Sequence, residues 1–238
     1  MQNDKPDFGI DAPGVVRTLA LVGIALLVVG AVSLWLGQAG IAALTLWPGC
    51  SMSAASLLMV LSSKLGKPLV TRRMIARLQL HGDEQVLDVG CGRGQLLLDV
   101  ARRLPQGRAT GLDLWSTRDQ SGNAAAATER NADLAGVRER VQNDTGDMRQ
   151  MPYPDASFDA IVSSLAIHNL PSKTDREQAI GEIARVLKPG GLLALLDLRH
   201  TGSYLHSLRA NGLPNARRSW PILLMFPWVW IVRASKPS

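Results

Sequence analysis

The sequence predicts an α/β protein in which a seven-stranded, mostly parallel sheet carries helices on both faces and a closing antiparallel strand pair. Two transmembrane helices are expected before this sheet. Three observations predict the arrangement: two uncharged apolar runs precede residue 62, β-rich and helix-patterned runs alternate from Glu84 onward, and glycines occupy every second position from Gly90 to Gly94. Strands separated by helices favour a parallel sheet with helices on both faces.

The two apolar runs, residues 19–36 and 41–61, contain no charged residue. A helix of 18 residues, the length of the first run, is about 27 Å long, which approaches the hydrocarbon thickness of a bilayer. Pro48 and Gly49 weaken the second run, although membrane helices tolerate both residue types. A cleaved signal peptide is disfavoured, because aspartates at positions 4, 7 and 11 leave no basic leading region. A buried helical hairpin of a soluble fold is the other alternative.

Basic residues directly after the second run predict the orientation of the chain. They are Lys64, Lys67, Arg72, Arg73 and Arg77. The positive-inside rule places such a cluster in the cytoplasm, and two spans return the N-terminus to the same side. We therefore expect an N-terminal tail at residues 1–14, a membrane hairpin at 15–63, a basic linker helix at 64–80 and a cytoplasmic α/β domain at 81–238. The cluster could bind anionic headgroups or form a solvated linker.

Hydrophobic periodicity divides the α/β part into strands and helices. Strands are expected at residues 85–90, 108–114, 140–143, 158–167 and 192–198, and helices at 94–104, 119–135, 174–187 and 203–211. Two final apolar runs, near 217–224 and 228–234, are expected to form the closing antiparallel pair. Parallel sheets bind ligands beyond the carboxyl ends of their strands. Functional residues are thus expected just after Val89, Leu112, Asp144, Ser163 and Leu196.

The stretch VLDVGCGRGQ, residues 86–95, places Gly90, Gly92 and Gly94 between the first strand and the first helix. Glycines there allow a sharp turn and let a ligand lie against the main chain, while the helix start offers unpaired N–H groups. The spacing is G-x-G-x-G, with Gln95 where a dinucleotide fingerprint has glycine, which disfavours NAD or FAD. No P-loop lysine follows. Two cysteines, Cys50 and Cys91, are too few for a disulfide framework or a zinc cluster, and no metal site is expected.

Two further strand ends carry acidic residues. Asp113 ends the second strand, where a carboxylate can accept both hydroxyls of a ribose. Gly146-Asp147-Met148 follows the third strand and offers an acceptor and an apolar side chain suited to an adenine ring. Each aspartate alone could equally cap a helix or form a turn. Their order and their places at successive strand ends favour a nucleoside site.

This combination resembles the class I S-adenosylmethionine-dependent methyltransferases, which have a Rossmann-like sheet. The segments that carry the resemblance are VLDVGCGRG, TGLDLW, NDTGDMRQMPYPDASFDAIVSS and ARVLKPGGLLALLDL, within residues 77–234. PYPDASFDAIVSSLAIHNL looks like the small-molecule branch typified by the quinone C-methyltransferases. The first sixty or so residues lie outside the resemblance.

The resemblance implies S-adenosylmethionine as the cofactor and assigns residues to its parts. Asp88 and the loop Gly90, Cys91, Gly92 and Gly94 would hold the methionine end. The nucleoside would be bound by Asp113 at the ribose and by Leu114, Asp147 and Met148 at the adenine. Ser163 and Ser164 would lie where the fourth strand opens toward the sulfonium.

Methyl transfer to an acceptor needs alignment and exclusion of water, and it needs a base only if the nucleophile must lose a proton. His168, just past the fourth strand, is the candidate catalytic base, with pocket lining as its alternative role. Asn169 has similar status, and His200 is a second possibility.

A small lipophilic acceptor near the membrane surface is the expected substrate. No nucleic acid is expected, because SSLAIH replaces the Asn/Asp-Pro-Pro-aromatic run of nucleobase methyltransferases. The apolar C-terminal run, with Trp220 and Trp228, is read as sheet core and alternatively as a bilayer contact or a lipophilic pocket wall. The alternatives are a methyltransferase for a soluble substrate, a non-catalytic cofactor-binding membrane module or scaffold, and an NAD-linked oxidoreductase. The acceptor atom and the oligomeric state stay open.

Overall fold

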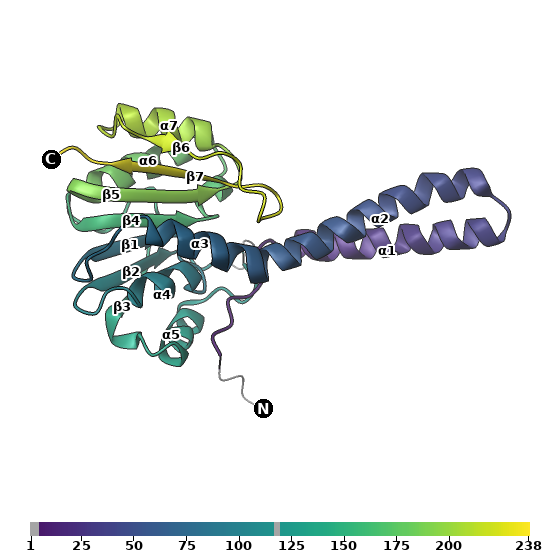
Figure 1. Cartoon of the computed structure of the whole chain (residues 1–238), viewed down its shortest axis with the longest axis horizontal. Helices are drawn as coiled ribbons and strands as arrows, with labels where there is room; N and C mark the ends of the chain where they lie inside the picture. Colours follow the sequence, from purple (N-terminus) through teal and green to yellow (C-terminus); the bar gives the residue numbers. More distant parts are fainter. Residues whose placement is uncertain (1–4, 117–119) are drawn as a thin grey trace.

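The computed structural model describes residues 5–116 and 120–238. It consists of a long helical hairpin that projects from an α/β domain (Figure 1). In Figure 1 the carboxyl edge of the parallel strands faces the hairpin, and the C-terminus lies at the opposite end of the domain.

The hairpin is made of α1 (Pro13–Trp35) and α2 (Ala39–Leu61). Small residues let the two helices approach closely: a side chain at Gly23 would lie 2.9 Å from the Ser53 nitrogen, and one at Gly30 would overlap the Leu46 side chain. Both helices are long and apolar enough to cross a membrane, by length and composition, and only 11% of each apolar window is buried. Their large apolar side chains therefore point outward rather than into a core.

The second hairpin helix runs on into the α/β domain. A π-helical turn (Ser62–Gly66) links α2 to α3 (Lys67–Ala76), so the three segments form one long rod (Figure 1). Residues 64–80 are thus helical only as far as Ala76, and Gln79 takes a positive φ of 51°.

The sheet has seven strands in the order β3-β2-β1-β4-β5-β7-β6. They are β1 (Gln85–Val89), β2 (Arg108–Asp113), β3 (Val141–Thr145), β4 (Phe158–Ser164), β5 (Leu187–Asp197), β6 (Arg217–Arg218) and β7 (Trp230–Ser235). The first five are parallel, and β7 pairs antiparallel with β5 and β6. This order confirms the predicted Rossmann-like sheet with its closing antiparallel pair.

Helices cover both faces of the sheet, as predicted. One core packs α3, α4 (Gln95–Ala101) and α5 (Ala125–Leu134) against the face that carries Val86 and Val162. The other core packs α6 (Lys173–Val186) and α7 (Thr201–Ala210) against the face that carries Leu87 and Ile161. Neighbouring residues of one strand enter opposite cores because side chains alternate across a sheet. Two 3₁₀ turns, Arg138–Arg140 and Ile167–Asn169, are the remaining elements among the described residues.

Several boundaries differ from the prediction: the strand expected over 158–167 ends at Ser164, the helix expected over 94–104 ends at Ala101, and three further differences are larger. The strand expected near 217–224 is only two residues long, because Pro221 has no N–H to donate and the chain then turns. β5 begins at Leu187, before the Pro189–Gly191 bulge rather than after it. The helix expected over 119–135 begins at Ala125, and residue 119 lies outside the described residues.

Candidate active site

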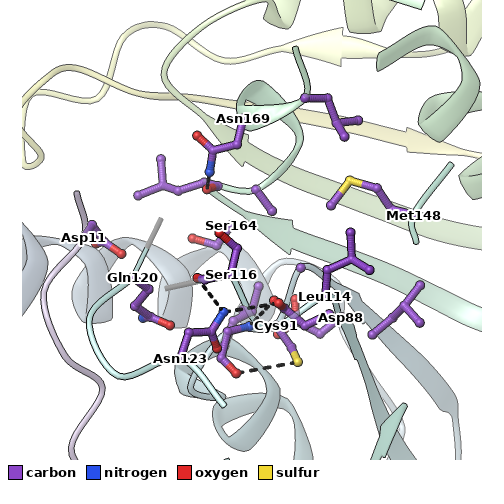
Figure 2. Close-up of a pocket in the computed structure, with 18 of the residues that line it drawn as sticks. Asp11, Asp88, Cys91, Leu114, Ser116, Gln120, Asn123, Met148, Ser164 and Asn169 are labelled. Carbon is purple, nitrogen blue, oxygen red and sulfur yellow. Dashed lines mark hydrogen bonds between the residues drawn. The ribbon is translucent and has the colours of Figure 1, made fainter. Parts of the chain in front are cut away.

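A cavity of about 320 Å³ lies at the carboxyl edge of the sheet, where the sequence places the functional residues. Its wall combines the loop after β1, the end of β2, and the segments after β3 and β4 (Figure 2). Eight of the predicted site residues line it: Asp88, Gly90, Cys91, Gly92, Asp113, Leu114, Met148 and Ser164. Pockets of this size suit small organic ligands.

The glycine loop is held in a shape that side chains would not allow. Gly90 has a φ of +72°, and a Cβ there would lie 2.2 Å from the Ala166 Cβ. Gly92 has a φ of +54°, and a Cβ there would lie 2.3 Å from Gln120 Oε1. The left-handed backbone and the close neighbours both require glycine, so the main chain itself forms this part of the cavity wall. Gly94 does not line the cavity and instead precedes α4 with a φ of +85°.

Asp88 is a buried carboxyl group that points at the cavity without a partner. Its side chain is 2% exposed, and within the described part of the chain neither carboxyl oxygen has a hydrogen-bond partner. Burial, together with the nearby Asp113 carboxylate, raises the pKa of Asp88 to about 8. A buried carboxyl group without a donor is costly, so this position is suited to a cationic ligand group.

Asp113 is the last residue of β2 and lies beside the glycine loop. Its Oδ2 accepts the Gly92 N–H at 2.8 Å, and its Oδ1 accepts the Trp115 N–H at 2.6 Å and the Asn123 amide at 3.2 Å. These donors fix the carboxylate at the cavity wall. Leu114, 59% exposed, follows it at the rim.

In the segments after β3 and β4, some of the predicted site residues line the cavity and others do not. Met148 and Ser164 line the cavity. Asp147 does not, because its carboxylate is paired with Arg149 at 2.6 Å, and that guanidinium lowers the pKa of Asp147. Ser163 also lies outside, because its hydroxyl donates to the Val89 carbonyl at 2.7 Å within the sheet.

His168 lies in the 3₁₀ turn after β4, but its ring faces Asp197 rather than the cavity. The backbone N–H of His168 and the hydroxyl of Tyr204 donate to Asp197 Oδ2 at 3.1 and 3.0 Å, and the His168 ring lies beside Oδ1. The neighbouring Asn169 lines the cavity instead. In this conformation His168 therefore supports the turn that presents Asn169.

Two charged residues at the base of the hairpin complete the cavity wall, and sequence reasoning did not select them for the site. Asp11 lies two residues before α1, and Lys67 opens α3. Both line the cavity, and Lys67 Nζ donates to Asp11 Oδ1 at 2.8 Å. Ser63 Oγ donates to the other Asp11 oxygen at 3.1 Å. The only available signal was their charge beside an apolar hairpin.

The N-terminal tail is tied to the glycine loop. Asn131 and Asp7 exchange two hydrogen bonds, of 3.0 and 2.8 Å, and Arg93 donates to the Asp7 carboxylate at 3.0 Å. The side-chain amide of Gln120 also links the tail to the glycine loop: its Nε2 donates to the Phe8 carbonyl, and its Oε1 accepts the backbone N–H of Arg93. Gln120 and Asn123, from the loop after β2, were also not selected as site residues, although their polar loop position was visible.

The residues present in this structure fit S-adenosylmethionine. The partnerless Asp88 carboxyl and the glycine main chain offer an anionic group and a side-chain-free wall within one cavity. Lys67, in the same cavity, offers a cation for a carboxylate. A zwitterionic amino acid group joined to a nucleoside matches this donor set.

Comparison with known proteins agrees with this fit. Residues 87–195 match the family model described as a methyltransferase domain. The chain is 34% identical over 128 residues to the 27-O-demethylrifamycin SV methyltransferase of Amycolatopsis mediterranei, covering 54% of this chain and 43% of that protein. It is 32% identical over 127 residues to the demethylmenaquinone methyltransferase of Symbiobacterium thermophilum, covering 53% and 47%. The chain thus spans less than half the length of these relatives.

A solved structure shows the same fold. The crystal structure of the cyclase SpnF has a TM-score of 0.62 and 24% identity, and the match covers 74% of this chain and 83% of that chain. Motif order and sheet topology agree with the family match: residues 87–195 are similar to a methyltransferase domain, and the sheet around them has the class I S-adenosylmethionine-dependent methyltransferase fold.

Proposed function

We propose that the protein is a membrane-anchored methyltransferase that transfers a methyl group from S-adenosylmethionine to a small lipophilic acceptor. The observation that carries this proposal is the shared wall of cavity and hairpin: Asp11 and Lys67, at the bases of the two apolar helices, line the same cavity as Asp88. A bilayer that surrounds the hairpin would therefore lie next to the cavity. The rifamycin and demethylmenaquinone in the names of two relatives support a small-molecule acceptor.

The cofactor, when bound, supplies a methyl group on a positively charged sulfur. In the proposed arrangement the Asp88 carboxylate holds its ammonium group, and Lys67 holds its carboxylate against the glycine loop. Asp113 accepts the ribose hydroxyls, and Leu114 and Met148 pack against the adenine. Asp147 contributes to the adenine site only if it exchanges Arg149 for the ligand.

The acceptor side of the cavity is proposed to be the segment after β4. Leu165, Ala166, Leu170 and Pro171 line it with apolar surface, and Asn169 adds one polar group. Such a wall excludes water and orients an apolar ring. His168 acts as a general base only if its ring turns away from Asp197 into the cavity. An acceptor that loses no proton on methylation requires no such base.

The membrane topology is proposed as two spans with the methyltransferase domain in the cytoplasm. Helices that are apolar on all sides, and mostly unburied within the chain, are suited to lipid. A buried hairpin of a soluble fold would show these side chains packed inside the protein. The basic residues that follow α2 support the cytoplasmic side.

The experiment is mass spectrometry of membrane and soluble extracts incubated with the full chain in lipid nanodiscs and deuteromethyl-labelled S-adenosylmethionine. A labelled product from the membrane extract, absent with the Asp113→Ala variant, supports the proposal. Label appearing only in the soluble extract would overturn the lipophilic acceptor while leaving methyl transfer intact.

A second candidate is a cofactor-binding membrane module that transfers no methyl group. A neighbour with this fold is named as a cyclase, so the fold alone does not specify methyl transfer. Cofactor binding by calorimetry, with no S-adenosylhomocysteine formed in either extract, would support this module instead.

A further inference from the structure

The segment between β6 and β7, residues 219–229 and here called the β6–β7 loop, exposes large apolar side chains beside the hairpin. Trp220 is 89% exposed, Leu223 70% and Trp228 56%, and Leu224 and Phe226 are also exposed. Met225 and Val229 point into the core instead, and Ile222 pairs with Val229 through a β-bridge. The loop is thus an ordered projection that is anchored on its inner side and apolar on its outer side.

The loop is attached to the point where the hairpin joins the domain. The Phe226 N–H donates to Ser62 Oγ at 3.0 Å. The Leu224 carbonyl approaches Gly66 so closely that a Cβ there would lie 2.2 Å from the Leu224 oxygen. Both partners belong to the π-helical turn between α2 and α3. In Figure 1 the loop, in yellow, reaches toward this junction.

The chemistry of this surface matches the interface of a bilayer. Tryptophan is enriched at the headgroup level, where its ring meets both apolar and polar surroundings. Leu65, 61% exposed, continues the apolar surface of α2 into the same turn. Exposed basic residues accompany it: Arg217 and Arg218 directly precede the loop, and Lys64 lies in the turn that holds it. Apolar tips beside cations are suited to a leaflet that contains anionic lipid.

We propose that the β6–β7 loop inserts its apolar side chains into the leaflet next to the domain, as a second membrane contact beside the hairpin. This inference rests on the proposed membrane hairpin. Two contacts, joined through the turn Ser62–Gly66, restrict rotation of the domain about the hairpin axis. The loop and the carboxyl edge then face the same bilayer surface, and the cavity opens toward the phase that holds a lipophilic acceptor.

The test places an environment-sensitive nitrobenzoxadiazole label on single cysteines of the full chain in nanodiscs that contain anionic phospholipid. The loop is labelled through Leu223→Cys in a Cys50→Ser background, and Cys91 stays unlabelled because it is buried. The matched control is Gln106→Cys, an exposed position next to the amino end of β2, at the other edge of the sheet. Native Cys50, exposed on α2, reports insertion of the hairpin itself.

Nitroxide-labelled lipids are expected to quench the labels at positions 223 and 50 several-fold more strongly than the label at 106. Arg217→Gln should reduce the gain in loop quenching that anionic lipid produces, whereas Arg103→Gln, exposed near the far edge, should not.

Three outcomes overturn the proposal in different ways. Quenching at position 50 without quenching at 223 removes the loop contact and leaves the anchor. Absence of quenching at position 50 removes the anchor and the loop contact together, without bearing on methyl transfer. Shielding of position 223 in lipid-free detergent that grows with protein concentration would assign the surface to a second copy of the chain.

Discussion

Asp88→Asn should abolish a proton release that accompanies cofactor binding in the unaltered protein. With a pKa of about 8, the buried Asp88 carboxyl is almost fully protonated in the empty cavity at pH 6.5. The protonated fraction is 1/(1 + 10^(6.5 − 8)), or about 0.97. An ammonium group placed against it favours the carboxylate, so binding should release about one proton. The cofactor's own α-amino group, with an ordinary pKa of about 7.7–8.0, is already charged at this pH.

The assay is titration calorimetry with S-adenosylmethionine at pH 6.5 in two buffers of different ionisation enthalpy. For the unaltered chain, the binding enthalpies in the two buffers should differ by about the difference between the buffers' ionisation enthalpies, multiplied by one proton. For Asp88→Asn the difference should be much smaller. The asparagine keeps the shape of the side chain and cannot ionise. Equal heats in both buffers for the unaltered chain, at measurable affinity, would refute the assignment of Asp88 to the ammonium group.

Four further expectations follow from the same contacts. Asp88→Asn should stabilise the cofactor-free chain increasingly as pH rises from about 4 to about 8, because a carboxyl whose folded pKa of about 8 exceeds its ordinary value of 3.8 loses its stabilising contribution over that window; thermal unfolding at three pH values tests this. Asp113→Ala should weaken cofactor binding by about 1–3 kcal/mol, whereas the exposed Asp133→Ala should leave the dissociation constant unchanged. Lys67→Met should weaken binding by about 1.5–3 kcal/mol through the lost charged hydrogen bond; an unaltered affinity in calorimetry would remove Lys67 from the carboxylate site. Gly30→Leu should separate α1 from α2, because a Cβ there already overlaps Leu46; disulfide trapping of cysteine pairs across the hairpin measures the separation, and trapping at the original rate would count against the packing.

The sheet and its glycine loop could be predicted because their signals are local. Val86 to Val89 alternate between two cores, and Gly90 and Gly92 must accept positive φ values beside close neighbours. The same locality accounts for Asp113, the last residue of β2, and for Met148, which comes three residues after β3. Each of these assignments requires only that a short motif be placed on a known edge of a parallel sheet.

The rest of the site depends on contacts that join distant parts of the chain. Asp7 meets Asn131, which lies 124 positions later, and Asp11 meets Lys67 across the whole hairpin. No short pattern announces such pairs. The sequence also does not indicate which of two neighbouring side chains faces the cavity. Ser163 and Ser164 are adjacent, yet only Ser164 lines it. His168 illustrates the same difficulty, because its partner Asp197 stands at the end of another strand.

The hydrogen bonds that join Asp7 to Asn131 and Arg93 have a consequence for biosynthesis. Ribosomes make a chain from its amino end, so Asp7 is finished long before the partners that will hold it. The membrane helices are synthesised next, and they are expected to insert before the residues that bind the N-terminal tail have been made. The N-terminal tail, although synthesised first, would therefore be among the last segments to reach its native position. The cavity wall would be complete only after the helix that contains Asn131 has folded.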